Sequence, residues 1–128
     1  MEVVKKLSIL SILIVILSCG EMEKKDVYGK YYNTFEEGVN HYVALNEDNL
    51  FVHYYHKKGE EEKYNKGKWT LRTEENGVVK VSFKAWESFG IYAKEYGCSN
   101  CLWTVKLKDG ELGFNYDLPR EMNFYKKD

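Results

Sequence analysis

Hydrophobic and polar residues alternate at a period of two over most of the chain after residue 26. The stretch VVKVSF, residues 78–83, places three apolar side chains on one face and polar ones on the other. The stretch LWTVKL, residues 102–107, repeats this alternation. Successive side chains of a strand point to opposite faces of a sheet, so this pattern predicts strands with one buried face.

Short segments of this kind recur along the chain, separated by turn-forming glycine and asparagine. Residues 85–97 break the pattern and fit either a short helix or a long loop. In the turn at residues 46–49, Asn49 is expected to take the left-handed conformation usually given to glycine. We therefore predict an all-β fold, a small antiparallel up-and-down barrel or meander of about eight strands. The predicted strands are Val27 to Thr34, His41 to Leu45, Leu50 to His56, Tyr64 to Arg72, Val78 to Phe83, Leu102 to Leu107, Glu111 to Tyr116 and residues 121–126.

The first twenty residues have a different pattern, a continuous apolar run from Leu7 to Leu17 preceded by Lys5 and Lys6. This run is shorter than the roughly 20 apolar residues that cross a bilayer. A positive segment followed by a short apolar one is the layout of a secretory signal. We therefore expect an exported protein.

The residues that end this run, Ile16-Leu17-Ser18-Cys19, resemble the lipobox of bacterial lipoproteins. The resemblance implies that the signal peptide is removed before Cys19 and that Cys19 carries acyl chains, such as palmitate. It also implies a protein of the bacterial cell envelope that is held to the membrane by its lipid anchor. Gly20, in place of Asp, favours the outer membrane, facing either the periplasm or the surface. The expected organisation is a signal peptide (1–18), an anchor and tether (19–26) and a single β domain (27–128).

Composition supports this picture and narrows the function. Aromatic residues make up 16% of the chain, with 11 tyrosines, as suits a pleated, half-buried surface. Removing residues 1–18 changes the net charge from −1 to −2, so we expect no nucleic-acid partner. The sequence lacks the motifs of nucleophilic hydrolases, phosphate-binding loops and zinc proteases. We predict no catalysis, no cofactor and no metal.

A second resemblance concerns the domain itself. The segments YGKYY (28–32), ALNEDNLFVHYY (44–55) and GKWTL (67–71) follow one another in a way that resembles the small lipocalin-like, or calycin-type, barrels of bacterial envelopes. The resemblance implies a barrel with a ligand cavity. In the eukaryotic-type family Gly-x-Trp lies in the first strand, whereas here it occurs at residues 67–69.

Aromatic side chains are the candidate ligand-binding residues. They could line a cavity for an apolar ligand or offer stacking faces to a sugar. The alternative is that they pack the core and the sheet surface. The candidates are Tyr31, Tyr54, Trp69, Trp103 and Tyr116, with Trp86 in the wider set.

Cysteine and histidine provide the remaining candidate chemistry. Cys98 and Cys101 form the motif CSNC, for which we favour a disulfide over redox activity or zinc binding, because an exported chain meets oxidising conditions. His41 and His53 are expected as near neighbours on one face, where they could bind a metal, although solvated histidines at the rim of the barrel are the favoured interpretation. His56 falls on the opposite face from His53.

Two functions are consistent with these observations. The first is a non-catalytic binding module for a small apolar ligand or a protein partner. The second is an inhibitor or immunity protein that neutralises an envelope-acting toxin or enzyme. A carrier needs an open cavity of several hundred Å³, whereas an inhibitor needs a filled core and an exposed acidic or aromatic patch.

Overall fold

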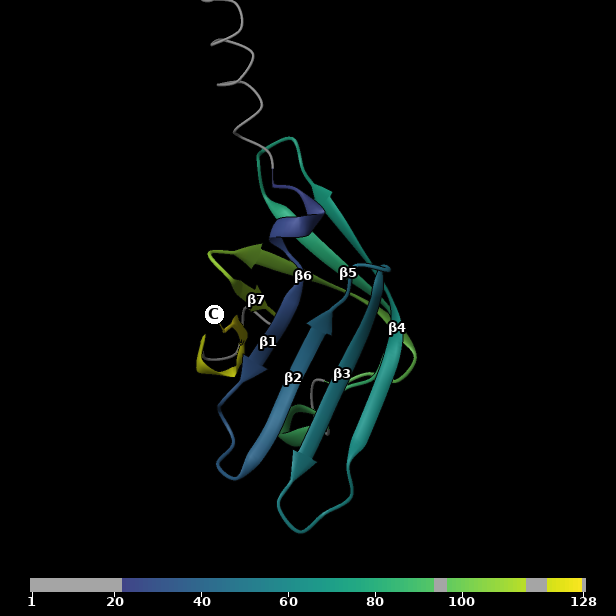
Figure 1. Cartoon of the computed structure of the whole chain (residues 1–128), viewed down its shortest axis with the longest axis vertical. Coiled ribbons are helices and arrows are strands. Elements are labelled where there is room, and N and C mark those ends of the chain that lie inside the picture. Colours follow the sequence, from purple (N-terminus) through teal and green to yellow (C-terminus); the bar gives the residue numbers. More distant parts are fainter. Residues whose placement is uncertain (1–21, 94–96, 115–119, 128) are drawn as a thin grey trace, which may run out of the picture.

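The computed structural model describes residues 22–93, 97–114 and 120–127. They form a closed barrel of antiparallel strands in which each strand pairs with the next and the last pairs with the first (Figure 1). The predicted all-β barrel is confirmed. The strands are β1 (Gly29–Asn33), β2 (Val39–Leu45), β3 (Leu50–Lys57), β4 (Lys63–Thr73), β5 (Val79–Trp86), β6 (Cys101–Lys108), β7 (Glu111–Gly113) and β8 (Phe124–Lys126).

Three short 3-10 helices lie outside the strands: η1 (Lys24–Asp26), η2 (Gly90–Tyr92) and η3 (Arg120–Met122). Of the segment 85–97, residues 85–93 hold the end of β5, a connection and then the short helix η2, so both predicted alternatives are present in part. Residues 94–96 lie outside the described residues, as does the end of the predicted strand at residues 115–116. Among the described residues, no helix has the length and apolar character needed to cross a bilayer.

The turn between β2 and β3 forms as predicted. Asn49 has a φ of 65°, in the left-handed region, and its N–H donates to the Asn46 carbonyl oxygen at 3.2 Å. The N–H of Asn46 donates in turn to the carbonyl of Leu50 at 3.0 Å. This turn sets the register of the β2–β3 hairpin, in which Tyr42 faces Tyr54.

The barrel interior is packed with aromatic and branched side chains. Phe51 and Phe83 meet edge to face with ring centroids 5.0 Å apart, and Trp86 lies 4.9 Å from Phe83. The alternation predicted for residues 78–83 and 102–107 holds, since Val81 and Val105 are buried. The core comprises Val27, Tyr31, Val43, Leu45, Phe51, Trp69, Val81, Phe83, Trp86, Val105, Leu107, Leu112 and Phe124.

Gly67 is required by the close approach of two strands. A Cβ at this position would collide with the carbonyl oxygen of Lys84 and lie 2.9 Å from the Phe51 ring. The missing side chain lets β4 pass close to the irregular end of β5, where the register shifts between Phe83 and Trp86.

We expect Gly67→Ala to lower the free energy of unfolding by about 2 kcal/mol or more, because the backbone must move to admit the methyl group. Gly113→Ala is the matched control, since its nearest neighbouring atoms lie 3.9 Å away. Urea unfolding of both variants measures the difference. Equal stability of the two variants would contradict the steric argument.

Candidate functional site

Two of the predicted ligand-binding residues lie in the closed interior. Trp69 is fully buried, and its indole N–H donates to the carbonyl oxygen of Asn46 at 3.1 Å. Tyr31 is 1% exposed, and its hydroxyl donates to the carbonyl oxygen of Val27 at 2.7 Å. Each polar group is thus satisfied by the backbone, which lets these large side chains serve as core.

The other predicted residues do not join them in one lining. Trp103 is half-buried on the inner face of β6, and its N–H donates to the Phe114 carbonyl oxygen at 3.3 Å. Tyr54 is on the outer face, because it alternates along β3 with the inner residues His53 and Tyr55, but its neighbours leave it only 9% exposed. Tyr116 lies outside the described residues. Tyr31, Tyr54 and Trp69 therefore do not line a common cavity.

Aromatic rings occupy the middle of the barrel, where such a cavity would be expected. The Phe114 ring lies 5.1 Å from that of Trp86 and 4.8 Å from that of Phe124. Two hollows formed by described residues lie instead at the ends of strands. One, of about 400 Å³, is lined by Gly38, Val39, Asn40, His56 and Lys58, and the other, of about 380 Å³, by Met22, residues 76–79 and residues 106–109.

His41 and His53 form a buried pair. Their Nε2 atoms lie 2.8 Å apart. His41 is 3% exposed and His53 is 1% exposed. The expectation that they are neighbours is confirmed, but the expectation of solvated histidines at the rim is wrong. They are diagonal neighbours on the inner face of the β2–β3 hairpin, so the barrel encloses them.

The surroundings of the pair determine its protonation. The Nδ1 of His53 lies 2.9 Å from the Glu87 carbonyl oxygen, which can only accept, so Nδ1 carries the proton. The Nε2 of His53 must then accept a hydrogen bond from the Nε2–H of His41. Burial lowers the pKa of His41 to about 3 and lowers that of His53 well below its usual value. Both rings are therefore neutral near pH 7.

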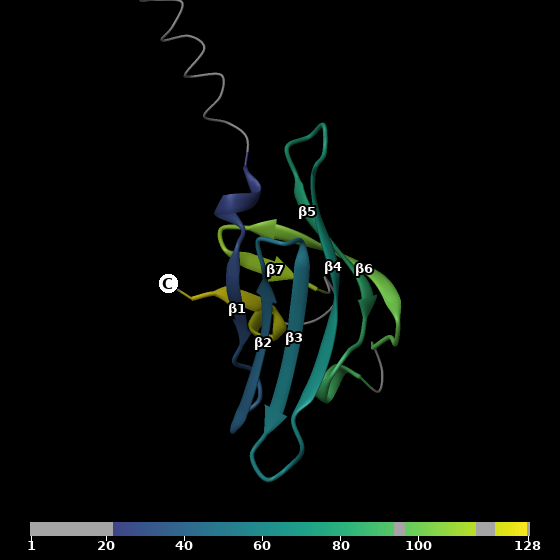
Figure 2. The same ribbon diagram turned by 45° about the vertical axis from the view of Figure 1, so that its right-hand side comes forward.

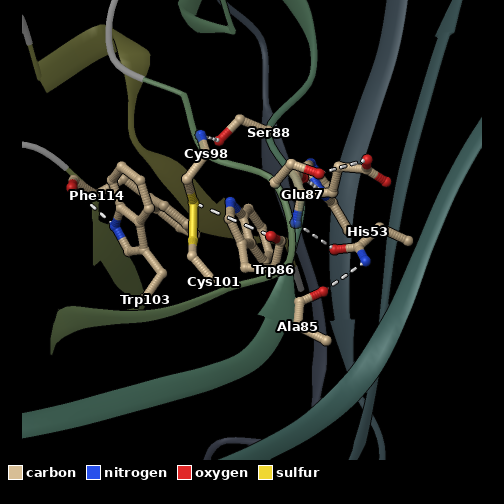
Figure 3. The surroundings of a disulfide bond; sticks show 11 residues. His53, Ala85, Trp86, Glu87, Ser88, Cys98, Cys101, Trp103 and Phe114 are labelled. Atoms are coloured by element: carbon tan, nitrogen blue, oxygen red, sulfur yellow. Dashed lines mark hydrogen bonds between the residues drawn. A yellow bond between two sulfur atoms is a disulfide. The ribbon is translucent and has the colours of Figure 1, made fainter.

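The disulfide between Cys98 and Cys101 lies near His53, Trp86 and Glu87 (Figure 3). The two Cα atoms are 6.1 Å apart, and Cys101 begins β6 opposite Trp86 of β5. The backbone of Ser88 donates to the Cys98 carbonyl oxygen at 2.9 Å, and the Ser88 hydroxyl accepts from the Cys98 N–H at 3.2 Å. The predicted disulfide thus joins the loop after β5 to the start of β6.

The outer face carries a feature that sequence reasoning missed, a row of tyrosines that crosses five strands. Each tyrosine of the row faces the next across a strand pair, from β8 through β1, β2 and β3 to β4. At a strand spacing of about 4.8 Å, the row spans about 19 Å of the barrel surface. We call this set the tyrosine row: Tyr125, Tyr32, Tyr42, Tyr54 and Tyr64.

Four rings of the row, those of Tyr32, Tyr42, Tyr54 and Tyr64, pack against one another. Tyr42 and Tyr54 stack with centroids 5.0 Å apart and planes at 26°, and Tyr64 follows 5.1 Å from Tyr54. Lys30 places its Nζ 4.6 Å from the centroid of the Tyr42 ring, a cation–π contact. Tyr32 also contacts Tyr42, with ring centroids 5.7 Å apart.

The hydroxyl groups at one end of the row converge on a carboxylate. Glu62 accepts hydrogen bonds from Tyr64 at 2.7 Å and from Tyr54 at 3.1 Å. The bond to Glu62 raises the pKa of Tyr64 to about 12, and the same two bonds lower the pKa of Glu62. Tyr64 therefore stays neutral, and at 53% exposed it is the most accessible tyrosine of the row.

Comparison of the chain with protein-family models, curated proteins and solved structures finds no match. The described residues contain no group of three or more His, Cys, Asp or Glu side chains arranged to hold a metal ion. The tyrosine row could have been found from sequence by pairing the strands around the turn at 46–49, since that turn places Tyr42 opposite Tyr54.

The histidine pair makes the stability of the barrel depend on pH. Above pH 6.5 both rings are neutral whether the chain is folded or unfolded. As the pH falls from 6.5 towards 3, the unfolded chain binds protons that the folded barrel does not. We expect the free energy of unfolding to fall by up to about 1.4 kcal/mol per pH unit for each histidine.

Urea unfolding between pH 7.5 and 5 measures this dependence, above the range where most carboxylates titrate. His41→Phe should reduce the slope. His56→Gln is the control, because His56 lies half-buried on the outer face, and this variant should keep the wild-type slope. A stability that does not change between pH 7.5 and 5 would contradict the buried neutral pair.

Proposed function

We propose that this protein is a lipid-anchored protein of the bacterial cell envelope that binds a partner protein on the tyrosine row, without catalysis. The observation that carries the proposal is the row itself, which places five aromatic side chains side by side on the outside of a closed barrel. Tyrosine is enriched where proteins meet, because its ring buries a large area while its hydroxyl forms a hydrogen bond.

The packed interior argues against a carrier of a small apolar ligand. Such carriers enclose the ligand in a cavity of roughly 300–1,000 Å³ lined mostly by apolar side chains. Here Phe51, Phe83 and Trp86 contact one another in the centre of the barrel.

The orientation of the tyrosine rings favours a protein over a sugar. A sugar stacks on the open face of an aromatic ring, but Tyr42 and Tyr54 cover each other's faces at 5.0 Å. The two ends of the row are the most exposed, with Tyr64 at 53% and Tyr125 at 37%, and these side chains are open to contact by a partner protein. The lysine contact at Tyr42 adds a positive charge beside the row.

The location rests on the lipobox resemblance. Acylation of Cys19 would hold the barrel to a membrane, and a mature protein with several acyl chains stays bound where one chain alone would not. Cys19 precedes Met22, the first described residue, by three positions. The barrel would therefore lie close to the surface of the membrane.

A second candidate function is that of an inhibitor or immunity protein that neutralises an envelope-acting toxin or enzyme. A filled core combined with an exposed aromatic surface is what such a blocking protein requires. An inhibitor would bind through the same tyrosine row, so the two candidate functions differ only in the activity of the partner protein. Loss of the partner's activity in the complex would favour the inhibitor.

Photo-crosslinking in the native membrane tests the proposal. A photoreactive amino acid in place of Asn40, which is exposed on β2 beside Tyr42, should yield a discrete adduct with one partner protein. We expect the double variant Tyr32→Ser/Tyr64→Ser to reduce that adduct about tenfold or more, as for residues that dominate an interface. Native mass spectrometry of the same preparation should detect acyl chains on Cys19 and no retained apolar molecule.

The control is Phe35→Ser, which removes an exposed aromatic side chain outside the row and should leave the adduct unchanged. An adduct that persists at the wild-type level in the double variant would refute the row as the binding surface. If the purified chain held a stoichiometric amount of an apolar molecule, the carrier function would be the better-supported proposal.

A further inference from the structure

A second row of side chains borders the tyrosine row, two residues away along the same strands. Lys30 of β1 faces Ala44 of β2. Val52 of β3 lies between Ala44 and Lys66 of β4. Strands β1 to β4 follow one another along one side of the barrel (Figure 2), so at a strand spacing of about 4.8 Å the two lysine Cα atoms lie about 14 Å apart. We call this set the lysine-flanked row: Lys30, Ala44, Val52 and Lys66.

The centre of the lysine-flanked row is apolar. Ala44 and Val52 form it, and Leu50, which lies on the outer face of β3 two residues before Val52, extends it and is 42% exposed. Leu50 in turn faces Lys68 of β4. The apolar centre is thus bordered by lysines on β1 and β4, and by the stacked tyrosines along a third side. An apolar centre within a polar rim is the usual anatomy of a protein interface.

The charge that strands β1 to β4 contribute to this face is positive. None of these four strands contains Asp or Glu. The Lys30 Nζ lies 4.6 Å from the ring centroid of Tyr42, and the Lys127 Nζ lies 5.6 Å from that of Tyr32. These cation–π contacts place both ammonium groups over the tyrosine row. A protein that docks on the row therefore meets positive charge there.

The negative group beside the tyrosine row is the carboxylate of Glu62, and its position gives the face a direction. Glu62 comes two residues before Tyr64, whereas Lys66 comes two residues after it. The hydroxyl groups of Tyr54 and Tyr64 already donate to Glu62, which keeps this carboxylate at the β4 end of the row. A carboxylate of a partner would be repelled near Glu62 and attracted near Lys30 and Lys66.

We infer that the protein bound by the tyrosine row presents an acidic surface, with an apolar side chain over Ala44 and Val52 and carboxylates beside Lys30 and Lys66. The inference rests on the proposed function and specifies the chemistry of the partner. Apolar and aromatic contacts supply the centre of such an interface, while complementary charges speed association and fix its orientation. A basic surface would be rejected by like charge.

The packing of the rings favours an acidic protein over a nucleic acid. Nucleic acids also match positive charge combined with aromatic side chains, but they stack their bases on open ring faces. Here Tyr42 and Tyr54 stack on each other at 5.0 Å, and the Lys30 ammonium group lies over the Tyr42 ring. The centre of the row therefore lacks the open ring faces that a base requires.

Two crosslinking reactions in the native membrane test the chemistry of the partner. The first is the photo-crosslink from position 40, which captures a partner bound on this face. The second uses a water-soluble carbodiimide, which joins a lysine amine to a carboxylate in direct contact with it. We expect the carbodiimide to yield an adduct with the same protein, and mass spectrometry to find Lys30 or Lys66 joined to an Asp or Glu of that protein.

Arginine and glutamate variants separate contact from charge. Lys30→Arg/Lys66→Arg keeps both positive charges but removes the amines that the carbodiimide couples, so it should lose the carbodiimide adduct and keep the photo-adduct. Lys30→Glu/Lys66→Glu should reduce both adducts about tenfold or more, because like charges would then oppose each other. About 0.5 M salt, which screens exposed charges, should reduce the wild-type photo-adduct several-fold.

The matched control is Lys84→Glu/Lys108→Glu, which makes the same change of charge at two exposed lysines of β5 and β6. It should leave both adducts at the wild-type level. A photo-adduct without any carbodiimide link to Lys30 or Lys66 would overturn the acidic partner. So would an equal loss of the adduct in the control and in Lys30→Glu/Lys66→Glu. The arginine variant decides the question even where the glutamate variant unfolds.

Failure of the inference is distinguishable from failure of the proposed function. A photo-adduct that requires Tyr32 and Tyr64 but neither Lys30 nor Lys66 would keep the tyrosine row as the binding surface and refute only the acidic partner. Absence of any discrete photo-adduct would refute the proposed function and the inference with it. A photo-adduct that nuclease removes would identify a nucleic acid as the partner and would also refute both.

Discussion

The pairing of β1 with β8 is the contact on which the rest of the structure depends. Only two residue pairs join these strands, Tyr31 with Lys126 and Tyr32 with Tyr125, yet they close the sheet and leave no free edge between its first and last strands. Side chains reinforce the closure, since the Asn33 amide donates to the Met122 carbonyl oxygen at 2.7 Å. The same closure encloses the aromatic core and extends the tyrosine row onto β8.

Among the described residues, aromatic side chains contact one another inside the barrel, and for this reason the proposed binding surface lies on its outside. Small barrels of this size can either pack side chains in the centre or hold one small ligand. Here Tyr31 and Trp69 donate to backbone carbonyl groups, and the two ring nitrogens of His53 are bonded to the Glu87 carbonyl group and to His41. Such side chains are held in place by the fold and have no polar atom directed at a ligand, so the arguments for binding come from the outer surface.

Two sides of the barrel differ in chemistry. Strands β8 and β1–β4 carry the tyrosine row, whereas the outward positions of β5 and β6 carry lysine, serine, threonine and leucine.

Much of the fold could be predicted because period-two alternation and turn residues are local signals. All eight strands, the left-handed Asn49 and the proximity of His41 to His53 follow from such signals. The ends of strands were less predictable. The close approach of Lys84 to Gly67 and the register shift near Trp86 arise from contacts between strands, which no single segment encodes.

The candidate site was harder to predict than the fold. Composition alone indicated that tyrosine and tryptophan matter, but Tyr54 was grouped with Tyr31 and Trp69, from which the barrel separates it. The sequence by itself determined which residues alternate and therefore which can share a face of a strand. Only the tertiary structure decided which face is inside, which tyrosines and lysines stand side by side, and whether the centre is open, because these depend on how strands distant in sequence pair and close.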